Sequence, residues 1–105
     1  MLGLKVSING AEPVICGAED LHVLMAGVHL AGQLGSQTQH PRPSEPPDLW
    51  VRAGGMTSRP SGQTDEHLNW VRQDGLKVGD TVTIEVGQTD RPAVPIERTP
   101  ASERA

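Results

Sequence analysis

Histidine and cysteine are the side chains of this 105-residue chain with the chemistry to bind a metal ion or to act as a nucleophile. The four histidines and the single Cys16 show no CxxC, HxH or HExxH spacing. His22 and His29 lie seven positions apart, on one face of a helix but on opposite faces of a strand. Metal sites require several ligands in a strict geometry. The sequence therefore predicts no metal site and no cofactor, and we interpret His22 and His29 as half-buried sheet residues.

A second candidate for chemistry is the titratable cluster at residues 65–67. A carboxylate beside an imidazole can perform general acid–base catalysis, and on a strand Asp65 and His67 would share a face. No serine or cysteine has a nucleophile context such as GxSxG. Gly54 and Gly55 could cradle an anion, but no GxGxxG or Walker lysine accompanies them, and a bulge or tight bend is the alternative. These four residues form a candidate ligand-binding or catalytic site, although the sequence favours a protein that is not an enzyme.

Tryptophan and arginine mark a candidate protein-binding surface. Trp50 lies in the phase opposite to Leu49 and Val51, so Trp50 and Arg52 would face outward together if those two residues face the core. An exposed tryptophan near an arginine is typical of an interaction hot spot. Alternatively, the strand is buried on both faces and Trp50 points inward. Trp70, the second tryptophan of the chain, is a further candidate contact.

Composition excludes several classes of partner. Nine Lys and Arg against thirteen Asp and Glu give a net charge of -4, and no basic stripe is present, so we expect no nucleic-acid binding. The longest mostly apolar stretch, residues 21–34, is too short to span a bilayer, and the start of the chain does not resemble a signal peptide. A single cysteine fits a reducing compartment. We therefore expect a cytoplasmic protein that does not insert into membranes.

Alternation of apolar and polar residues predicts strands that would position these side chains. Residues 2–8 alternate strictly and run into Asn9-Gly10, a pair typical of a type I′ hairpin turn. The returning strand would be residues 12–16, with Pro13 at an edge or at the strand start because it cannot donate to a ladder. Shorter strands are expected at 49–53 and 67–71.

The clearest strand follows the turn dipeptide Gly79-Asp80. Val82, Ile84 and Val86 alternate with polar residues, which predicts one face against the core and one face in water. Residues 21–34 are ambiguous between a helix that begins after Asp20 and a long strand. We favour the strand because the neighbouring elements are strands that need partners, and because three glycines in fifteen residues, Gly27, Gly32 and Gly35, weaken a helix.

These elements predict a mainly β fold, a small antiparallel sandwich or open barrel of five to six strands. An α+β fold with one helix at 21–34 is the alternative. We expect one compact domain over residues 1–89, a Pro-rich loop at 35–48 and a disordered tail at 90–105. The expected core is Leu4, Val6, Ile8, Leu24, Val28, Leu49, Val51, Leu68, Val82, Ile84 and Val86.

Three stretches in this order, LWVRAGGMTS at 49–58, EHLNW at 66–70 and LKVGDTVTI at 76–84, resemble a group of small, functionally uncharacterised bacterial proteins. That group has a similar GGxxS, EHLxW and LKVGDxVTI order. The resemblance covers the middle and the end of the ordered chain and departs in the Pro-rich loop and the tail. It implies one compact bacterial domain and assigns no catalytic residue.

The sequence leads to one main functional hypothesis and two alternatives. We expect a non-catalytic protein-interaction module, such as an inhibitor, an immunity-type protein or a complex subunit, that binds a protein partner through Trp50, Arg52 and Trp70. The first alternative is a small ligand-binding or enzymatic β domain that uses His67 and Asp65. The second is a homo-oligomer formed through an exposed strand edge.

Overall fold

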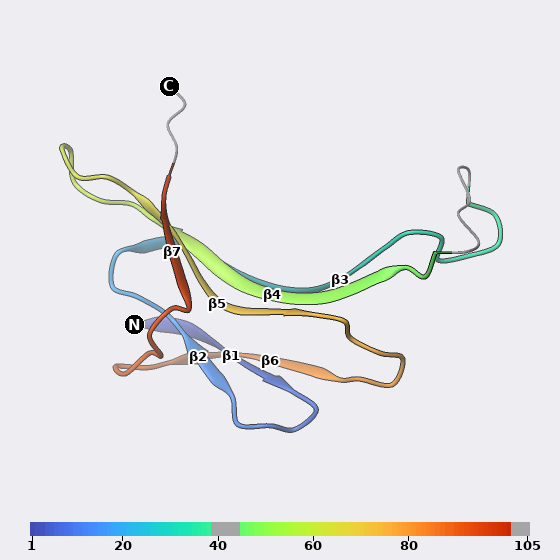
Figure 1. Cartoon of the computed structure of the whole chain (residues 1–105). Helices are drawn as coiled ribbons and strands as arrows, with labels where there is room; N and C mark the ends of the chain where they lie inside the picture. The colour runs from blue at the N-terminus through green and yellow to red at the C-terminus, as the bar shows by residue number, and fades with distance from the viewer. Residues whose placement is uncertain (39–44, 102–105) are drawn as a thin grey trace.

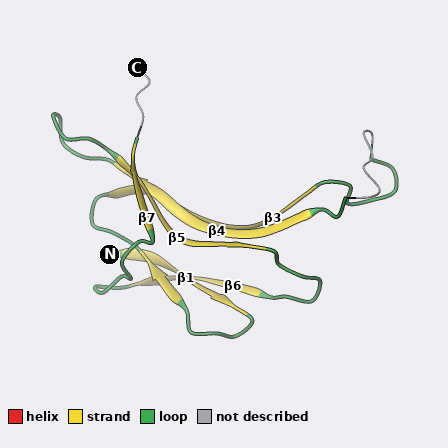
Figure 2. Cartoon of the chain, viewed as in Figure 1, coloured by secondary structure: helices red, strands yellow, loops and turns green. Residues whose placement is uncertain are grey.

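The computed structural model describes residues 1–38 and 45–101, and this part of the chain forms seven strands and no helix (Figures 1 and 2). The strands are β1 (Leu2–Ile8), β2 (Val14–Cys16), β3 (Leu21–Ala31), β4 (Asp48–Thr57), β5 (Glu66–Asp74), β6 (Val82–Gln88) and β7 (Glu97–Pro100). Sheet A has the order β2-β1-β6 and sheet B the order β3-β4-β5-β7, and all pairs are antiparallel. The prediction of a mainly β, open antiparallel sandwich is confirmed, with seven strands in place of five or six.

The first hairpin follows the predicted turn chemistry. Asn9 and Gly10 both have positive φ angles, 54° and 74°, as a type I′ turn requires. The amide of Ala11 donates to the carbonyl of Ile8 at 3.0 Å and closes the turn. Because β1 pairs with β2 on one side and with β6 on the other, β1 is the central strand of sheet A and β2 is one of its edges.

Residues 21–31 form strand β3, so the strand interpretation is confirmed and the helix alternative is wrong. The strand pairs along its length with β4, and a register shift between Leu21 and Val23 leaves His22 as an extra residue in a bulge. Gly32, with a φ angle of 134°, ends the strand in a conformation that other residues rarely adopt. The glycines that weaken a helix here serve the strand and its end.

A second bulge determines the position of Trp70. Ala53 of β4 pairs with Val71 of β5, whereas the next residue, Gly54, pairs with Asn69, so Trp70 has no partner of its own. In consequence the neighbours Trp70 and Val71 are both buried on the inner face of sheet B. A strict period of two would have sent one of them to the outside.

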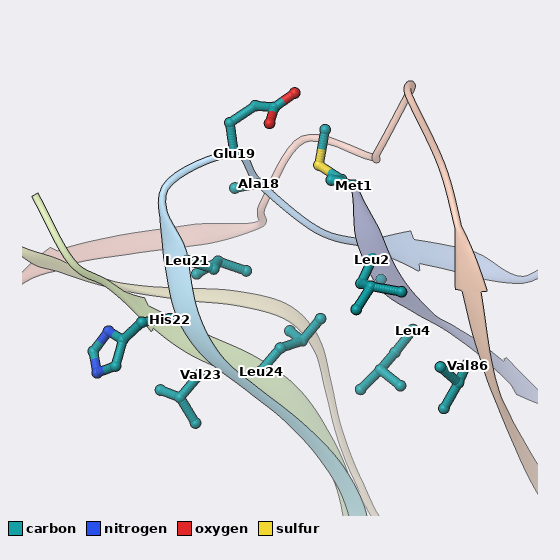
Figure 3. A pocket seen from close by; sticks show the side chains of 11 residues that line it. Met1, Leu2, Leu4, Ala18, Glu19, Leu21, His22, Val23, Leu24 and Val86 are labelled. Atoms are coloured by element: carbon teal, nitrogen blue, oxygen red, sulfur yellow. The ribbon is translucent and has the colours of Figure 1, made fainter.

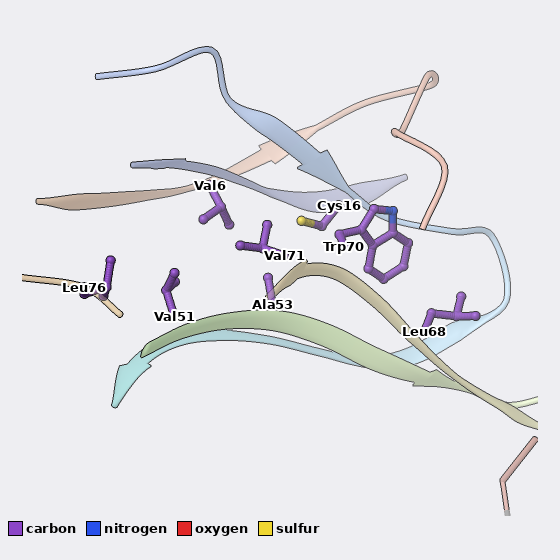
Figure 4. Close-up of a cluster of buried hydrophobic side chains, with 8 residues drawn as sticks. All are labelled: Val6, Cys16, Val51, Ala53, Leu68, Trp70, Val71 and Leu76. Atoms are coloured by element: carbon purple, nitrogen blue, oxygen red, sulfur yellow. The ribbon is translucent and has the colours of Figure 1, made fainter. Parts of the chain in front are cut away.

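The hydrophobic core lies between the two sheets (Figure 4). Its buried residues are Val6, Cys16, Val51, Ala53, Leu68, Trp70, Val71 and Leu76. Of the expected core, Val6, Val51 and Leu68 are buried, and Leu4, Ile8, Leu24, Leu49 and Val82 are partly buried and pack against the cluster. The alternation therefore identified most of the inner-face positions.

Three expected core residues are exposed, and this expectation is corrected. Val28 is 49%, Ile84 40% and Val86 74% exposed. Val28 pairs with the buried Val51, and Ile84 pairs with the buried Val6, so both lie on the inner face of their sheet. Ile84 remains exposed because β6 extends past β3, the last strand of sheet B.

The prediction of a disordered tail is wrong for residues 90–101, the part of the tail that the structure describes. Strand β7 pairs with β5, and the amide of Ala93 donates to the carbonyl of Ile15 at 2.8 Å. The amide of Ile96 donates to the carbonyl of Asn69, also at 2.8 Å. A segment with little apolar content is thus ordered by backbone hydrogen bonds to a sheet edge.

The Pro-rich loop expected at 35–48 falls partly on residues 39–44, which lie outside the described residues. Asp48 already belongs to β4, and residues 35–38 form no strand. No helix long and apolar enough to cross a membrane occurs within residues 1–38 and 45–101.

Candidate functional site

A groove of about 670 Å³ lies on the outer face of sheet B, the face turned away from sheet A. Sheet B curves so that this outer face is concave (Figure 1). The groove is lined by Val23, Met25, Ala26, Gly27, His29, Trp50, Arg52, Gly54, Gly55, Met56, His67, Asn69, Glu97 and Thr99. These residues come from all four strands of sheet B, so the groove exists only once the sheet has formed.

Glycines form part of the groove floor, because they place no side chain there. A Cβ atom at Gly54 would meet the carbonyl oxygen of Leu68 at 2.6 Å and overlap the side chain of Asn69, and one at Gly55 would overlap the carbonyl oxygen of Val23. The interpretation of these glycines as a bulge where only glycine fits is confirmed. An anion cradle does not form here, since β4 is paired on both sides and its amides lie in the sheet plane, directed at β3 and β5.

The most distinctive feature of the groove is a pair of stacked rings. Trp50 of β4 pairs across the sheet with His29 of β3, and their ring centroids lie 5.1 Å apart with an interplanar angle of 17°. Trp50 is half-buried and the neighbouring Val51 is buried on the inner face. The structure thus decides between the two alternatives for Trp50: it faces outward, on the same face as Arg52.

The charge of the groove is concentrated on Arg52. This residue is exposed and forms no ion pair within the described part of the chain. The carboxylate of Glu97, in contrast, lies 3.6 Å from the guanidinium of Arg72 and accepts a hydrogen bond from the Asn69 side-chain amide at 3.1 Å. One cation next to a stacked tryptophan is therefore left for a ligand or partner.

The structure separates Asp65 from His67. His67 is exposed and lines the groove, whereas Asp65 lies in the β4–β5 loop. The Asp65 carboxylate accepts hydrogen bonds from the Thr57 hydroxyl at 3.1 Å and from the Arg59 amide at 2.8 Å. The expected pairing of Asp65 with His67 as an acid–base unit is wrong, because this carboxylate organises a loop instead.

Arg59 holds together three separate segments, which sequence reasoning missed. Its Nε lies 3.0 Å from Asp20 and its Nη2 3.0 Å from Glu66, while Nη1 donates to the carbonyl of Thr64 at 2.9 Å. Glu66 also pairs with Arg98 of β7 at 3.0 Å. The hydrogen bond to Asp20, followed by the interactions with Glu66, raises the pKa of Arg59. No local pattern could reveal this network, since Asp20 lies 39 positions from Arg59.

Trp70 and Cys16 belong to the core. Trp70 is only 2% exposed, and its indole Nε1 donates to the carbonyl of Ala93 at 2.7 Å, so the expectation of a partner contact is corrected. Burial raises the pKa of the Cys16 thiol to about 11, which keeps it protonated and poorly nucleophilic. Within residues 1–38 and 45–101 no group of three or more His, Cys, Asp or Glu side chains could hold a metal ion.

The structure thus brings together Trp50, Arg52, His67, Gly54 and Gly55 in one groove. The additional groove residues include Met25 and Met56, which the sequence did not single out, and His29, which the sequence suggested only as a half-buried sheet residue. The sequence shows that these residues alternate with inner-face residues. It does not show the register between β3 and β4, which brings them together. No protein-family model matches the chain, and no curated protein and no solved structure matches it either.

Proposed function

We propose that the chain is a non-catalytic protein-interaction module that binds its partner in the groove on the outer face of sheet B. The observation that carries the proposal is the His29–Trp50 stack beside the unpaired Arg52 on a concave, glycine-floored surface. In keeping with the resemblance to small bacterial proteins, we propose a bacterial, cytoplasmic protein that acts as an inhibitor, an immunity-type protein or a complex subunit.

The composition of the groove supports a protein partner. Tryptophan, methionine and arginine are enriched at protein interfaces, and tryptophan and arginine are enriched among the residues that contribute most to binding. The stack with His29 already holds the Trp50 ring, so less side-chain entropy is lost on binding. Met25 and Met56 can adapt their flexible side chains to the surface of a partner.

The same groove argues against a hydrolytic mechanism. Its imidazoles, His29 and His67, are accompanied by a single carboxylate, Glu97, which already binds Asn69 and Arg72. In hydrolytic sites the catalytic base is typically oriented by a third group such as a carboxylate, and Glu97 is already engaged elsewhere. The groove residues therefore suit recognition better than catalysis.

A site-specific crosslinking experiment tests the proposal. A photoreactive amino acid replaces Met25 in the groove or, as a control, Thr83, which is exposed on the outer face of sheet A. In cells of the source bacterium we expect a crosslinked protein from position 25 that is absent from position 83. Trp50→Ala or Arg52→Ala should abolish the product, while Arg91→Ala, which removes the same charge from an exposed site outside the groove, should not.

The outcome that contradicts the proposal is equally clear. Identical products from positions 25 and 83, or a product that persists in folded Trp50→Ala, would mean that the groove does not select the partner. Circular dichroism and a urea midpoint close to those of the wild type establish that each variant is folded.

A small-molecule ligand is the second candidate. The groove volume of about 670 Å³ falls within the roughly 300–1,000 Å³ of typical ligand pockets. In this case, NMR spectra recorded during a screen of small metabolites would show a ligand that shifts the amide resonances of His67, Gly54 and Gly55. The variant His67→Ala would bind this ligand more weakly. The two functions are distinguished because a small ligand would bind without any protein partner.

A further inference from the structure

The two sheets are offset sideways, so the sandwich has one closed side and one open side. Strand β2 packs against β5, and β1 packs against β3. Because β6 follows β1 in sheet A and β3 is the last strand of sheet B, β6 extends past the edge of sheet B. On the closed side, residues 90–96 cover the gap, and Ala93 binds both Ile15 and Trp70.

The open side exposes apolar residues from the inner faces of both sheets. Sheet A contributes Ile84 and Val86, and sheet B contributes Val28 and Leu30, which is 50% exposed. At one end of this side a cavity of about 420 Å³ is lined mainly by apolar residues of β1, β3 and β6, as Figure 3 shows. Monomeric proteins rarely leave such contiguous apolar surface uncovered, and it commonly marks an interface.

Both strands on the open side have edges with little protection, since the one bulge of β3 lies at its start, at His22. Strand β3 is 11 residues long and contains no proline, Asp, Glu, Lys or Arg. Strand β6 contains one charged residue, Glu85, which alternates with Ile84 and Val86 and so lies on the outer face. Natural sheets usually protect such edges with charges, proline or bulges, because unpaired backbone groups bind another strand.

We propose that the chain forms a symmetric dimer in which β6 of each copy pairs with the β3 edge of the other. A two-fold axis that runs along the open side exchanges the two layers and places the projecting β6 of one copy in the vacant position beside β3 of its partner. Each resulting sheet has seven strands, three from sheet A of one copy and four from sheet B of the other. Strands β6 and β3 run in opposite directions, so the new pair is antiparallel (Figures 1 and 3).

A second copy fits this site because each chain carries both halves of the contact: the projecting strand β6 and the vacant position beside β3. Such a contact is isologous: each copy offers the same self-complementary surface, and the assembly closes at two subunits. Pairing in phase places the inner faces of β6 and β3 on the same side of one sheet. The opposite seven-stranded sheet of the dimer then covers Ile84, Val86, Val28 and Leu30. The groove on the outer face of sheet B stays open, so the dimer does not depend on the proposed function.

The first test uses the unmodified chain. Light scattering over a wide range of concentrations should show a molar mass that rises to twice that of one chain. Hydrogen exchange at high concentration should slow at the amides of β3 and β6, and leave the other edge strands, β2 and β7, unchanged. A molar mass of one chain at every concentration, or new protection at β2 or β7, would overturn the proposal.

The second test identifies the paired strands by placing a charged residue on each of them. Val28→Glu and Ile84→Lys each place an unpaired charge in the interface, which should weaken the dimer roughly a hundredfold. Both positions are exposed in the single copy, so both variants should fold. The control Val94→Lys lies on the closed side at an 83% exposed position and should still dimerise.

Mixing the two variants provides the decisive result. In a mixed dimer the lysine of one copy faces the glutamate of the other in one β6–β3 contact, and the second contact is unmodified. We therefore expect the mixture to recover a dimer that neither variant forms alone. If β3 paired only with β3, Ile84→Lys would still dimerise alone, and if β6 paired only with β6, Val28→Glu would. A dimer that persists in either variant, or a mixture that recovers no dimer, would therefore refute this arrangement.

Discussion

Trp50 and His29 are directly opposed residues of neighbouring strands, and their rings stack with centroids 5.1 Å apart on the concave face of sheet B. The stack therefore stabilises the sheet, and it also holds the half-buried indole of Trp50 ready to contact a partner. Cross-strand aromatic pairs typically contribute roughly 0.2–1 kcal/mol to stability.

The first prediction concerns this stack. His29→Ala should shift Trp50 fluorescence to longer wavelength, because the indole loses a covering ring, and should lower the free energy of unfolding by roughly 0.2–1 kcal/mol. His29→Phe should preserve both properties. Emission spectra in a Trp70→Phe background measure Trp50 alone, and identical spectra for the alanine and phenylalanine variants would contradict the stack.

The second prediction separates the two tryptophans. Trp70→Ala should destabilise the fold by about 3–5 kcal/mol, because it leaves a cavity in the core and removes the donor to the Ala93 carbonyl. Trp50→Ala should cost much less, since this side chain lies on the outer face. Urea unfolding measures both values. Equal losses in the two variants would argue against the different positions of Trp50 and Trp70.

The third prediction concerns the ion pairs of Arg59. Arg59→Met should lower stability, because Asp20, Glu66 and the carbonyl of Thr64 lose a common donor. Added salt should reduce the difference in free energy of unfolding between the wild type and Arg59→Met, since these side chains are partly exposed and their charges are screened. The control Arg91→Met has the same charge change at an exposed site. A double-mutant cycle with Glu66→Gln should show coupling to Arg59 and none to Arg91.

The fourth prediction is a pH dependence at the β5–β6 turn. The Lys77 amide, at 2.7 Å, and the Asn9 side chain, at 3.1 Å, donate to the Asp80 carboxylate and lower its pKa below 3.8. A lowered pKa means that this stabilisation is complete above 3.8, the value in the unfolded chain, and is lost as the pH falls through the lower folded value.

Asp80→Asn provides the comparison for this titration. At pH 7 the wild type should be the more stable protein, and the difference in urea midpoint should shrink as the pH falls below about 3.8. Glu12→Gln, at an exposed residue in the first hairpin, is the control. A difference that stays constant down to acidic pH would show that Asp80 does not act through its charge.

The fifth prediction concerns the thiol of Cys16. With its pKa raised to about 11 and its side chain fully buried, Cys16 should react very slowly with thiol reagents at pH 8. Unfolding in urea should restore rapid reaction. Fast labelling of the folded protein would show that the region between β2 and the core opens readily.

Local patterns of this sequence determined the strands and their turns. The alternation at residues 2–8 and 82–86 and the Asn9-Gly10 turn each reflect a conformational preference of adjacent residues. Such preferences act within a few positions, so they could be predicted without the rest of the chain. The same alternation also placed Trp50 and Arg52 on one face.

Only the tertiary structure decided which faces are covered. Val86 follows the alternation of a core strand yet is 74% exposed, because the sheets are offset and no strand lies opposite it. Trp70 is buried through a bulge whose position depends on the register between β4 and β5. Strand β7, within the described part of the tail, is ordered by pairing with the edge of β5 that β4 leaves free. Register, offset and edge pairing arise from contacts between distant segments, and no local pattern encodes them.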